Sequence, residues 1–491
     1  MKILFFYRGA ESFGIEQISA VLKEAGHKTE LVFDPGFDDT LYFKSPLFKL
    51  LNVKDKILSQ ARSFSPDLIA FSSTTNLYPY VKEIAYLLKK ELKVPTIIGG
   101  IHATVLPDYV LKENSFDIVC VGEGEYAMLE LADRMQNGRD FLDIENLWFK
   151  HNGKFIRNPE RPLIEDLDNL PFPDKDMFYN KGAFYKSVQL MISRGCLYRC
   201  SFCVNSFYFN RYGVNTLRRR SPDNIMKELK IYKEKYGPKF INFQDDVFNT
   251  SIPWLQDFGD KYEKEIGVKY LINIYPTMVN KAVARLLKES GCWGVCMGIQ
   301  SGNEAIRRSI LKRNETNTQI IQATRILKEF DIRLVTEFIF SLPNETPEEA
   351  WESVILNDKI GPDSTSTFVF YPFPGAELSE YSYRAGLIDD ETRKMINEGI
   401  GSYHTATYLK NSNNAYFLNI AYLLPLFAKF PWFIRKGYFK KICARKTNFM
   451  HRMLGVLGIP FSNPFLFKEK LLNYMRMFWV YFGTGKYKTL S

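Results

Sequence analysis

The chain has few cysteines for its length and lacks the features of secreted or membrane-spanning proteins. Only seven of its 491 residues are cysteine. This scarcity favours a reducing compartment over a disulfide framework. The apolar run at residues 2–7 is too short for a signal peptide, so we expect a cytoplasmic protein. Residues 411–428 lack charge, but they open with polar residues and contain Pro425, so we predict no membrane span there.

Three of the seven cysteines lie close together with the spacing C-x3-C-x2-C: Cys196, Cys200 and Cys203. Three thiolates on a short loop after a strand can hold three corners of a 4Fe-4S cube and leave the fourth iron open. Zinc is the alternative, but it usually takes four ligands, and no further Cys or His is an obvious fourth. The other four cysteines are expected to be buried packing residues.

The cysteine spacing resembles the motif of the radical S-adenosylmethionine enzymes, in which an aromatic residue, here Phe202, precedes the last cysteine. In that family the methionyl amine and carboxylate bind the open iron, and one electron cleaves the sulfonium to a 5′-deoxyadenosyl radical. The resemblance implies a 4Fe-4S cluster, S-adenosylmethionine and an electron donor such as flavodoxin or ferredoxin.

Short apolar runs alternate with helical patterns in the first 121 residues. Between the first two runs, Ile15, Ile18 and Leu22 repeat with helical spacing, and the pattern stops at Gly26. Runs that are apolar on both faces predict a doubly wound, Rossmann-like parallel sheet, in which ligands bind at the carboxyl ends of the strands. Strands are expected at residues 2–7, 67–72, 95–99 and 117–121.

The ends of these strands are rich in glycine and small polar residues. None of them carries G-x-G-x-x-G, so a dinucleotide site is disfavoured. The segments Gly-Gly-x-His-Ala-Thr and Val-Gly-Glu-Gly-Glu resemble the cobalamin-binding domain that precedes many radical S-adenosylmethionine cores. The candidate cobalamin residues are Ser72, Ser73, Thr74, Gly99, Gly100, His102, Ala103, Thr104, Gly122, Glu123, Gly124 and Glu125.

No histidine lies in the D-x-H-x-x-G context with which some cobalamin domains supply a protein imidazole. If cobalamin binds, we therefore expect no histidine ligand on its lower face. A weak axial donor makes Co(I), a strong nucleophile, easier to hold, and this suits methyl transfer. His102 either lines the corrin pocket or bonds a nearby carbonyl.

After a connector at residues 152–180, with a Pro-rich extended stretch at 170–174, the alternation of strands and helices restarts. Six repeats from residue 187 predict a partial (β/α)6 barrel whose cysteine loop follows the first strand. The predicted domains are a cobalamin-binding-like domain at 1–150, a linker at 151–186, the radical core at 187–387 and a mainly helical region at 388–491.

Other strand ends of the predicted barrel supply candidate S-adenosylmethionine ligands. The family places groups for the methionyl amine after the second strand, although helix-capping acids are the alternative here. After the fourth strand the sequence resembles the family's Gly-x-Glu-Ser-Gly, with Gln in place of Glu. The fifth strand runs into a turn that resembles the family's adenine-side turn. The candidates are Gln244, Asp245, Asp246, Gln300, Ser301, Gly302 and Ser341.

The resemblance implies an enzyme that methylates an unactivated carbon of a small-molecule or lipid substrate, using both cofactors in one closed cavity. A cobalamin-dependent radical cyclase or oxidative rearrangement is the alternative. A non-catalytic cobalamin or redox sensor is the alternative from another class. Transfer RNA methylthiotransferases carry three further N-terminal cysteines, whereas only Cys120 lies in that region.

Acidic residues are almost absent from the end of the chain. Residues 401–491 contain 14 Lys and Arg but one acid, Glu469, and aromatic pairs recur through them, as at 430–433. Basic and aromatic side chains together predict a surface that lies on an anionic membrane. Helices packing over the barrel mouth are the second interpretation, and nucleic-acid binding is the least favoured.

Overall fold

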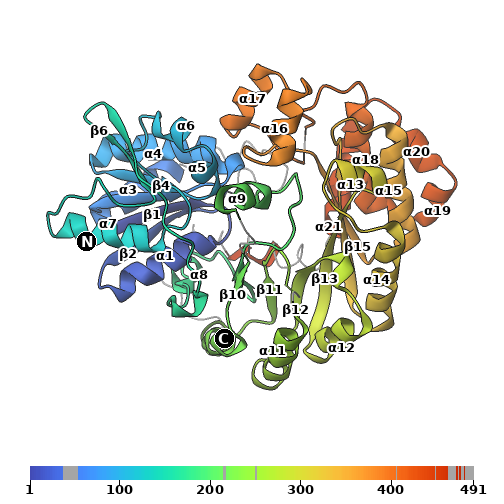
Figure 1. The fold of residues 1–491 in the computed structure, drawn as a ribbon, viewed down its shortest axis with the longest axis horizontal. Helices are drawn as coiled ribbons and strands as arrows, with labels where there is room; N and C mark the ends of the chain where they lie inside the picture. Colours follow the sequence, from blue (N-terminus) through green and yellow to red (C-terminus); the bar gives the residue numbers. More distant parts are fainter. Residues whose placement is uncertain are drawn as a thin grey trace. The chain divides into compact units, whose positions relative to one another are not determined.

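A computed structural model describes residues 1–36, 53–213, 217–248, 251–404, 406–447, 449–462, 471–473, 475, 476 and 480. The chain divides into two compact units. Unit 1 comprises Met1–Tyr185, Met395–Ile400 and Leu472–Ser491, and unit 2 comprises Lys186–Lys394 and Gly401–Leu471. Each unit contains one large sheet (Figure 1).

The sheet of unit 1 has seven strands in the order β2-β1-β3-β4-β5-β6-β7. The first five in this order are parallel, and β6 and β7 form an antiparallel hairpin at one edge. The strands are β1 (Lys2–Arg8), β2 (Lys28–Asp34), β3 (Leu68–Ser72), β4 (Thr96–Gly99), β5 (Ile118–Cys120), β6 (Leu147–His151) and β7 (Lys154–Arg157).

The doubly wound sheet predicted from the sequence is confirmed, with two corrections. Strand β2 was not predicted, because its first three residues, Lys-Thr-Glu, are exposed or half-buried and hide its apolar pattern. Residues 152–180 were predicted to be a connector, whereas β7 lies in that range and pairs with β6. Strand β7 is short and mostly exposed, so it lacks the apolar run that marked the inner strands.

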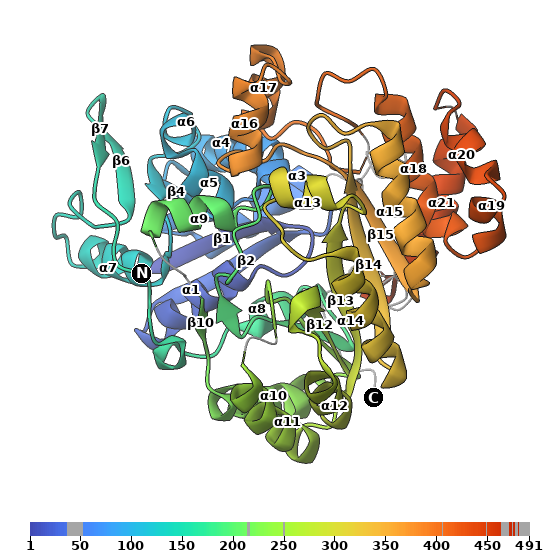
Figure 2. The ribbon, with the colours of Figure 1, turned by 45° about the vertical axis from the view of Figure 1, so that its right-hand side comes forward.

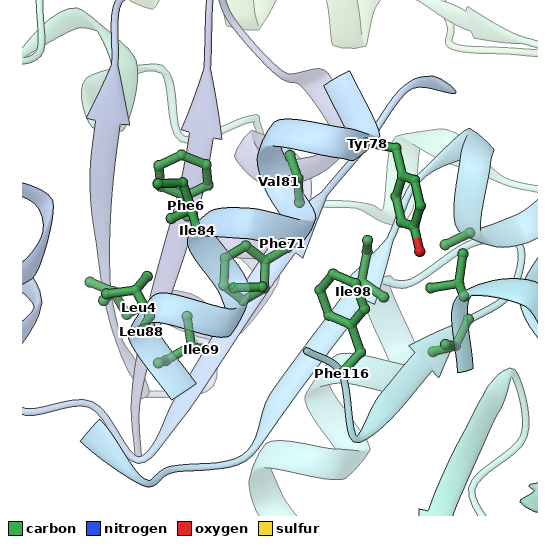
Figure 3. Packing of buried hydrophobic residues seen from close by; sticks show 14 of the residues in the cluster. Leu4, Phe6, Ile69, Phe71, Tyr78, Val81, Ile84, Leu88, Ile98 and Phe116 are labelled. Carbon is green, nitrogen blue, oxygen red and sulfur yellow. The ribbon is translucent and has the colours of Figure 1, made fainter. Parts of the chain in front are cut away.

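Helices cover both faces of the sheet of unit 1. Figure 3 shows one face, where Leu4, Phe6 and Phe71 pack against the apolar side of α4. Val81 and Ile84 of α4 are fully buried, as their helical spacing predicts. The helices are α1 (Phe13–Glu24), α3 (Val53–Phe64), α4 (Tyr78–Leu92), α5 (Ile101–Val105), α6 (Pro107–Leu111) and α7 (Glu125–Gln136).

The segment that follows the hairpin packs against the rest of unit 1 through the short helix α8 (Lys175–Tyr179). The Lys175 ammonium lies 2.9 Å from Glu11 Oε1 and 2.7 Å from Glu16 Oε2, and all three side chains are buried. The backbone N–H of Asp174 also donates to the Glu16 carbonyl oxygen. This segment is therefore held by a buried charge cluster as well as by backbone bonds.

The sheet of unit 2 has six parallel strands in the order β15-β14-β13-β12-β11-β8, the curled sheet of a partial barrel, as predicted. Its strands are β8 (Ser187–Leu190), β11 (Phe240–Phe243), β12 (Tyr270–Ile274), β13 (Cys292–Gln300), β14 (Arg333–Phe340) and β15 (Ser364–Val369). The intervening helices are α10 (Pro222–Tyr236), α11 (Ile252–Glu265), α12 (Lys281–Glu289), α13 (Glu304–Ser309), α14 (Asn317–Glu329) and α15 (Pro347–Ile360). Figure 2 shows α14 and α15 along one face of this sheet.

The basic end of the chain is mainly helical, as predicted. Helix α18 (Asn414–Phe427) contacts β15, α15 and α21 (Phe449–Ser462), and α19 (Pro431–Arg435) and α20 (Tyr438–Cys443) continue this layer. Glu469 lies outside the described residues. Among the helices of the described ranges, none combines the length and the apolar character needed to cross a bilayer.

Candidate active site

The three clustered cysteines lie on the loop that follows the first strand of the curled sheet. This loop begins beyond β9 (Ser193–Arg194), which pairs antiparallel with β10 (Arg218–Arg219). The buried carboxylate of Asp245 fixes the start of the loop. It accepts the backbone N–H of Ile192 at 3.0 Å and the hydroxyl of Ser193.

Each of the three cysteine sulfurs accepts one N–H donor. The Tyr198 backbone N–H lies 3.4 Å from Cys196 Sγ, and the Asn205 side-chain amide lies 3.6 Å from Cys203 Sγ. The third donor is the guanidinium of Arg313, at 3.7 Å from Cys200 Sγ. Such N–H donors stabilise thiolates, and hydrogen bonds to sulfur also set the reduction potential of an iron–sulfur cluster.

The three thiols lie near one another in a protein-lined environment. Burial, with a smaller contribution from neighbouring Asp246, raises the pKa of Cys196 and of Cys203 to about 12. Cys196 and Cys200 also raise the pKa of Cys203. Thiols with such pKa values are protonated at neutral pH and ionise when a metal centre compensates the charge. The donor set fits three corners of an iron–sulfur cube.

No three His, Cys, Asp or Glu side chains in the described ranges converge tightly enough to hold a single metal ion. A structural zinc site needs its ligands at about 2.0–2.3 Å from one ion, usually four of them.

Arg313 connects the cysteine loop to the fourth strand of the curled sheet. Besides Cys200 Sγ, its guanidinium donates to the Gly298 carbonyl oxygen at 2.7 Å and to Glu315 Oε1 at 2.7 Å. Glu315 in turn accepts the Tyr275 hydroxyl at 2.6 Å, and the Tyr275 ring lies 4.4 Å from the Arg313 guanidinium carbon. Burial opposes the charge of Arg313, but Cys200 and Glu315 outweigh it and raise its pKa.

The acids predicted after the second strand have different environments. Asp245 is buried, and burial raises its pKa to about 6 while the hydroxyl of Ser193 opposes the shift. Asp246 is open to solvent, accepts the Asn205 amide at 3.0 Å and interacts with two of the cluster thiols. Asp246 is thus the carboxylate beside the cysteine loop, whereas Asp245 braces the loop from below. Gln244 is half-buried at the end of β11.

The residues predicted after the fourth strand separate into two groups. Gln300 ends β13 with a left-handed φ of +69°, and its side chain lies over Gly298. Ser301 is fully buried, and the Gly302 N–H donates to Ser353 Oγ of α15 at 2.7 Å. A Cβ on Gly302 would lie 2.5 Å from the backbone of α15, so this glycine serves helix packing.

The remaining predicted S-adenosylmethionine residues also lie in unit 2. Ser341 follows β14 with φ +60°, is buried, and donates to Asn414 Oδ1 at 3.3 Å. Phe202 is half-buried between the second and third cysteines. Their contacts with the cosubstrate stay predictions.

In unit 1, the predicted cobalamin residues gather at the carboxyl ends of β3, β4 and β5. Gly100 has φ +88°, and a Cβ there would lie 2.8 Å from the Ser73 carbonyl oxygen. The Thr104 hydroxyl accepts the Gly122 N–H at 3.1 Å, which ties the ends of β4 and β5 together. At Gly100 the backbone of the β4 end therefore approaches the β3 end more closely than a residue with a Cβ would allow, and ligands of such sheets bind at this edge.

Several candidates in unit 1 are engaged within the unit itself. His102 is buried, and its Nδ1 lies 3.3 Å from Thr75 Oγ1. Its ring contacts the Tyr78 ring in a tilted arrangement with centroids 4.1 Å apart. Burial lowers the pKa of His102 to about 3, so the imidazole is neutral. Glu123 accepts the Ile164 N–H at 2.7 Å. The roles of the other candidates at this edge in cobalamin binding stay predictions: Ser72, Thr74, Gly99, Ala103, Gly124 and Glu125.

Four residues of this site were not predicted from the sequence: Arg313, Glu315, Tyr275 and Asn205. The first two lie in the polar run Lys-Arg-Asn-Glu, which has the composition of an exposed loop, although both side chains are buried. Asn205 follows Cys203 by two residues, and this proximity in sequence was the only available signal.

Comparisons with known proteins identify two families along the chain. Residues 190–356 match the radical SAM superfamily, and residues 9–132 match the B12 binding domain family. An uncharacterized methyltransferase of Pyrococcus horikoshii is 31% identical over 334 residues, which cover 67% of this chain and 72% of the relative.

Two further proteins are similar to this chain over most of its length. The anaerobic magnesium-protoporphyrin IX monomethyl ester cyclase of Rubrivivax gelatinosus is 24% identical, over 77% of this chain and 69% of the cyclase. The solved structure of the radical S-adenosylmethionine methyltransferase TsrM from Kitasatospora setae aligns with a TM-score of 0.64 and 18% identity, covering 79% of this chain and 77% of TsrM. This last similarity shows the fold.

Proposed function

The chain belongs to the cobalamin-binding-domain-containing radical S-adenosylmethionine enzymes, and we propose that it transfers a methyl group to an unactivated carbon. Such enzymes use a 4Fe-4S cluster, S-adenosylmethionine and cobalamin. The observation that carries the proposal is the loop of Cys196, Cys200 and Cys203, each sulfur with its own N–H donor, in a chain that also has a B12 binding domain.

When bound, the cluster supplies an electron to S-adenosylmethionine and the cobalamin carries the methyl group. The chain's own residues hold and orient these groups. Cys196, Cys200 and Cys203 would ligate three irons, and Asp246 beside them would attract the methionyl amine. Arg313 fixes the orientation of Cys200 relative to the fourth strand.

Methyl transfer is supported by the methyltransferase relative at 31% identity. The cyclase relative supports the second candidate, radical cyclisation or oxidative rearrangement without methyl transfer. The two differ in their products from S-adenosylmethionine. Methyl transfer to carbon consumes two molecules and releases S-adenosylhomocysteine from one and 5′-deoxyadenosine with methionine from the other, whereas the second candidate releases no S-adenosylhomocysteine.

The test uses the full-length protein, reconstituted anaerobically with iron, sulfide and cobalamin and reduced by flavodoxin or ferredoxin. It is incubated with S-adenosylmethionine carrying a deuterated methyl group and with fractionated small-molecule and lipid extracts. We expect 5′-deoxyadenosine, S-adenosylhomocysteine and a product that gains the labelled carbon. Deoxyadenosine alone would favour the cyclase-type reaction, and absence of both nucleosides would favour a sensor.

We further propose that α19 and α20 contact an anionic membrane, which would give access to a lipid or other hydrophobic substrate. Trp432 and Tyr438 are 55% and 49% exposed on these helices. Lys436 and Lys441 are exposed beside them, and residues 401–447 contain no acid. Aromatic and basic side chains in this combination bind the headgroup region of anionic bilayers. Other basic residues of the same helices serve the fold, since Arg435 pairs with Asp358 at 3.0 Å.

Flotation with vesicles tests this contact. We expect binding to phosphatidylcholine vesicles that contain phosphatidylglycerol and little binding to phosphatidylcholine alone. The double variant K436E/K441E should weaken binding several-fold, at about 1 kcal/mol per lysine removed. K227E/K230E on α10 is the control. Equal binding of both double variants would refute the proposed surface.

A further inference from the structure

Residues 395–400, named the docking segment below, belong to unit 1 although the chain on either side of them belongs to unit 2. The segment comprises the last turn of α17 (Asp390–Asn397) and the three residues that follow this helix. The match to the B12 binding domain family ends at residue 132. The docking segment is thus a part of unit 1 that comes from far outside this match in the sequence.

Gly399 brings the docking segment against the backbone that follows β3. This glycine is buried, and a Cβ on it would overlap the Thr75 carbonyl oxygen and lie 2.9 Å from Pro79 Cδ. Glu398 lies beside Tyr109, because burial raises the pKa of Tyr109 to about 12 and the Glu398 carboxylate adds to this shift. The contact with Thr75 therefore requires a residue without a side chain at position 399.

The backbone that Gly399 contacts is part of the predicted cobalamin edge. Residues 73–75, named the β3 loop below, follow the carboxyl end of β3 and include two of the predicted cobalamin residues. The β4 end holds this loop from within the B12 binding domain: the Ser73 N–H donates to the Gly99 carbonyl oxygen at 3.1 Å, and the His102 N–H donates to the Ser73 carbonyl oxygen at 3.2 Å. The docking segment supplies a further contact to the same loop, from outside that domain.

Helix capping alone does not account for Gly399. It ends α17 with a left-handed φ of +73°, and its N–H and that of the next residue donate to carbonyl oxygens of the last turn, both at 2.9 Å, as in a Schellman cap. Gly386 ends α16 (Glu377–Arg384) with the same hydrogen-bond pattern and a φ of +72°. A Cβ on Gly386 would meet no atom of the described residues within 4 Å. The two caps share their backbone geometry, and the contact with the β3 loop distinguishes Gly399.

A contact of this kind affects cofactor binding through the order of the loop. Ligands of doubly wound sheets bind at the carboxyl ends of the strands, where the β3 loop lies. Fixing the backbone of one residue costs about 1–2 kcal/mol of conformational entropy. A loop that is already fixed by its neighbours does not charge this cost to the binding of the cofactor. The effect is reciprocal, so a cofactor that binds the ordered loop also stabilises the docking segment on it.

We infer that the docking segment holds the β3 loop in its cobalamin-binding conformation, so that Gly399 and Glu398 are positioning residues for the cofactor. The inference rests on the proposed function, because it takes cobalamin as the cofactor bound at this edge. It assigns to the cobalamin site a segment that follows the radical core in the sequence and carries none of the glycine-rich motifs of the B12 binding domain.

The test titrates cobalamin into the full-length protein, reconstituted anaerobically with iron and sulfide, and measures the dissociation constant spectrophotometrically. We expect G399A to weaken cobalamin binding about tenfold, because its Cβ displaces the docking segment from Thr75. G386A introduces the same strain at an equivalent cap and should bind cobalamin within about twofold of wild type. Iron and sulfide contents should be unchanged in both variants, since the cysteine loop lies in unit 2. Equal cobalamin affinities of G399A and G386A would overturn the inference.

A second variant removes a contact without introducing a clash. E398A deletes the side chain beside Tyr109 and should weaken cobalamin binding several-fold. E391A, which removes an exposed acid from the first turn of the same helix, is its control and should bind like the wild type. An E398A protein that also binds like the wild type would contradict a positioning role for Glu398.

Hydrogen exchange in the wild type tests the reciprocal effect and needs no variant. Adding cobalamin should slow backbone exchange in the docking segment about tenfold and leave exchange at the cap of α16 unchanged. If G399A does not fold, this measurement still decides, because unchanged exchange at residues 395–400 would overturn the inference. None of these measurements needs a substrate or methyl transfer, so their failure leaves the proposed function standing. Wild-type protein that binds no cobalamin would instead contradict the proposed function itself.

Discussion

The two units bury charged groups in different ways. In unit 1, Lys175 lies between Glu11 and Glu16, and these carboxylates outweigh burial and raise its pKa. In unit 2, burial raises the pKa of Asp245, Glu337 and Glu345. Such shifts concentrate at functional sites. Unit 2 also contains compensated buried pairs, of which Arg313 with Glu315 is one. The charge cluster of unit 1 thus serves the fold, whereas in unit 2 the shifted acid Asp245 hydrogen-bonds the start of the cysteine loop.

The largest expected effect separates the two cofactors. Changing Cys196, Cys200 and Cys203 to Ala should abolish iron and sulfide binding, because no other group in the described ranges replaces the three ligands. Cobalamin should remain bound, since its predicted residues lie in unit 1. Iron, sulfide and cobalamin per chain are measured after anaerobic reconstitution, with C292A as the control for a buried cysteine outside the loop. Loss of cobalamin in the triple variant would show that the sites are not separable.

The next largest effect is expected from removing the cation of the buried charge cluster in unit 1, which consists of Lys175, Glu11 and Glu16. Lys175→Met leaves two buried carboxylates without their cation and should lower the free energy of unfolding of unit 1 by about 3–5 kcal/mol. Denaturant unfolding monitored by hydrogen exchange in β1 and α1 measures this loss. The control, Lys181→Met, removes a partly exposed ion pair with Glu30 and should cost about 1 kcal/mol or less. Equal losses would contradict a special role for the buried cluster.

A smaller effect concerns an acid of unit 2. Burial raises the pKa of Glu345 to about 8, above its ordinary value of 4.5. The folded state holds this proton more tightly than the unfolded state. The free energy of unfolding therefore falls as pH rises between the two pKa values of 4.5 and about 8, by up to about 1.4 kcal/mol per pH unit. We expect the wild type to lose about 2 kcal/mol between about pH 6 and 7.5 relative to Glu345→Gln. Parallel stability curves for both proteins over this range would refute the shift.

The sequence predicts much of this architecture because the informative features are local. The cysteine spacing, the buried strands β1 and β3, and the stop of α1 at Gly26 depend on nearby residues. The contact of Arg313 with Cys200 spans 113 positions, so only the folded barrel brings the two together. The polar start of β2 likewise hides a strand that its pairing with β1 reveals.

The smallest expected effect concerns Gly100, at the carboxyl edge of the sheet in unit 1 where cobalamin is predicted to bind. Gly100→Ala places a Cβ 2.8 Å from the Ser73 carbonyl oxygen at a φ of +88°, which L residues rarely adopt. We expect a loss of about 1–2 kcal/mol in stability, a displaced β3 end and weaker cobalamin binding with iron content unchanged. Spectrophotometric titration with cobalamin measures the loss of cobalamin affinity. Gly138→Ala, also at positive φ but with open space around it, is the control for backbone strain alone. If both variants bind cobalamin equally well, the close approach of Gly100 to Ser73 does not shape the cobalamin site.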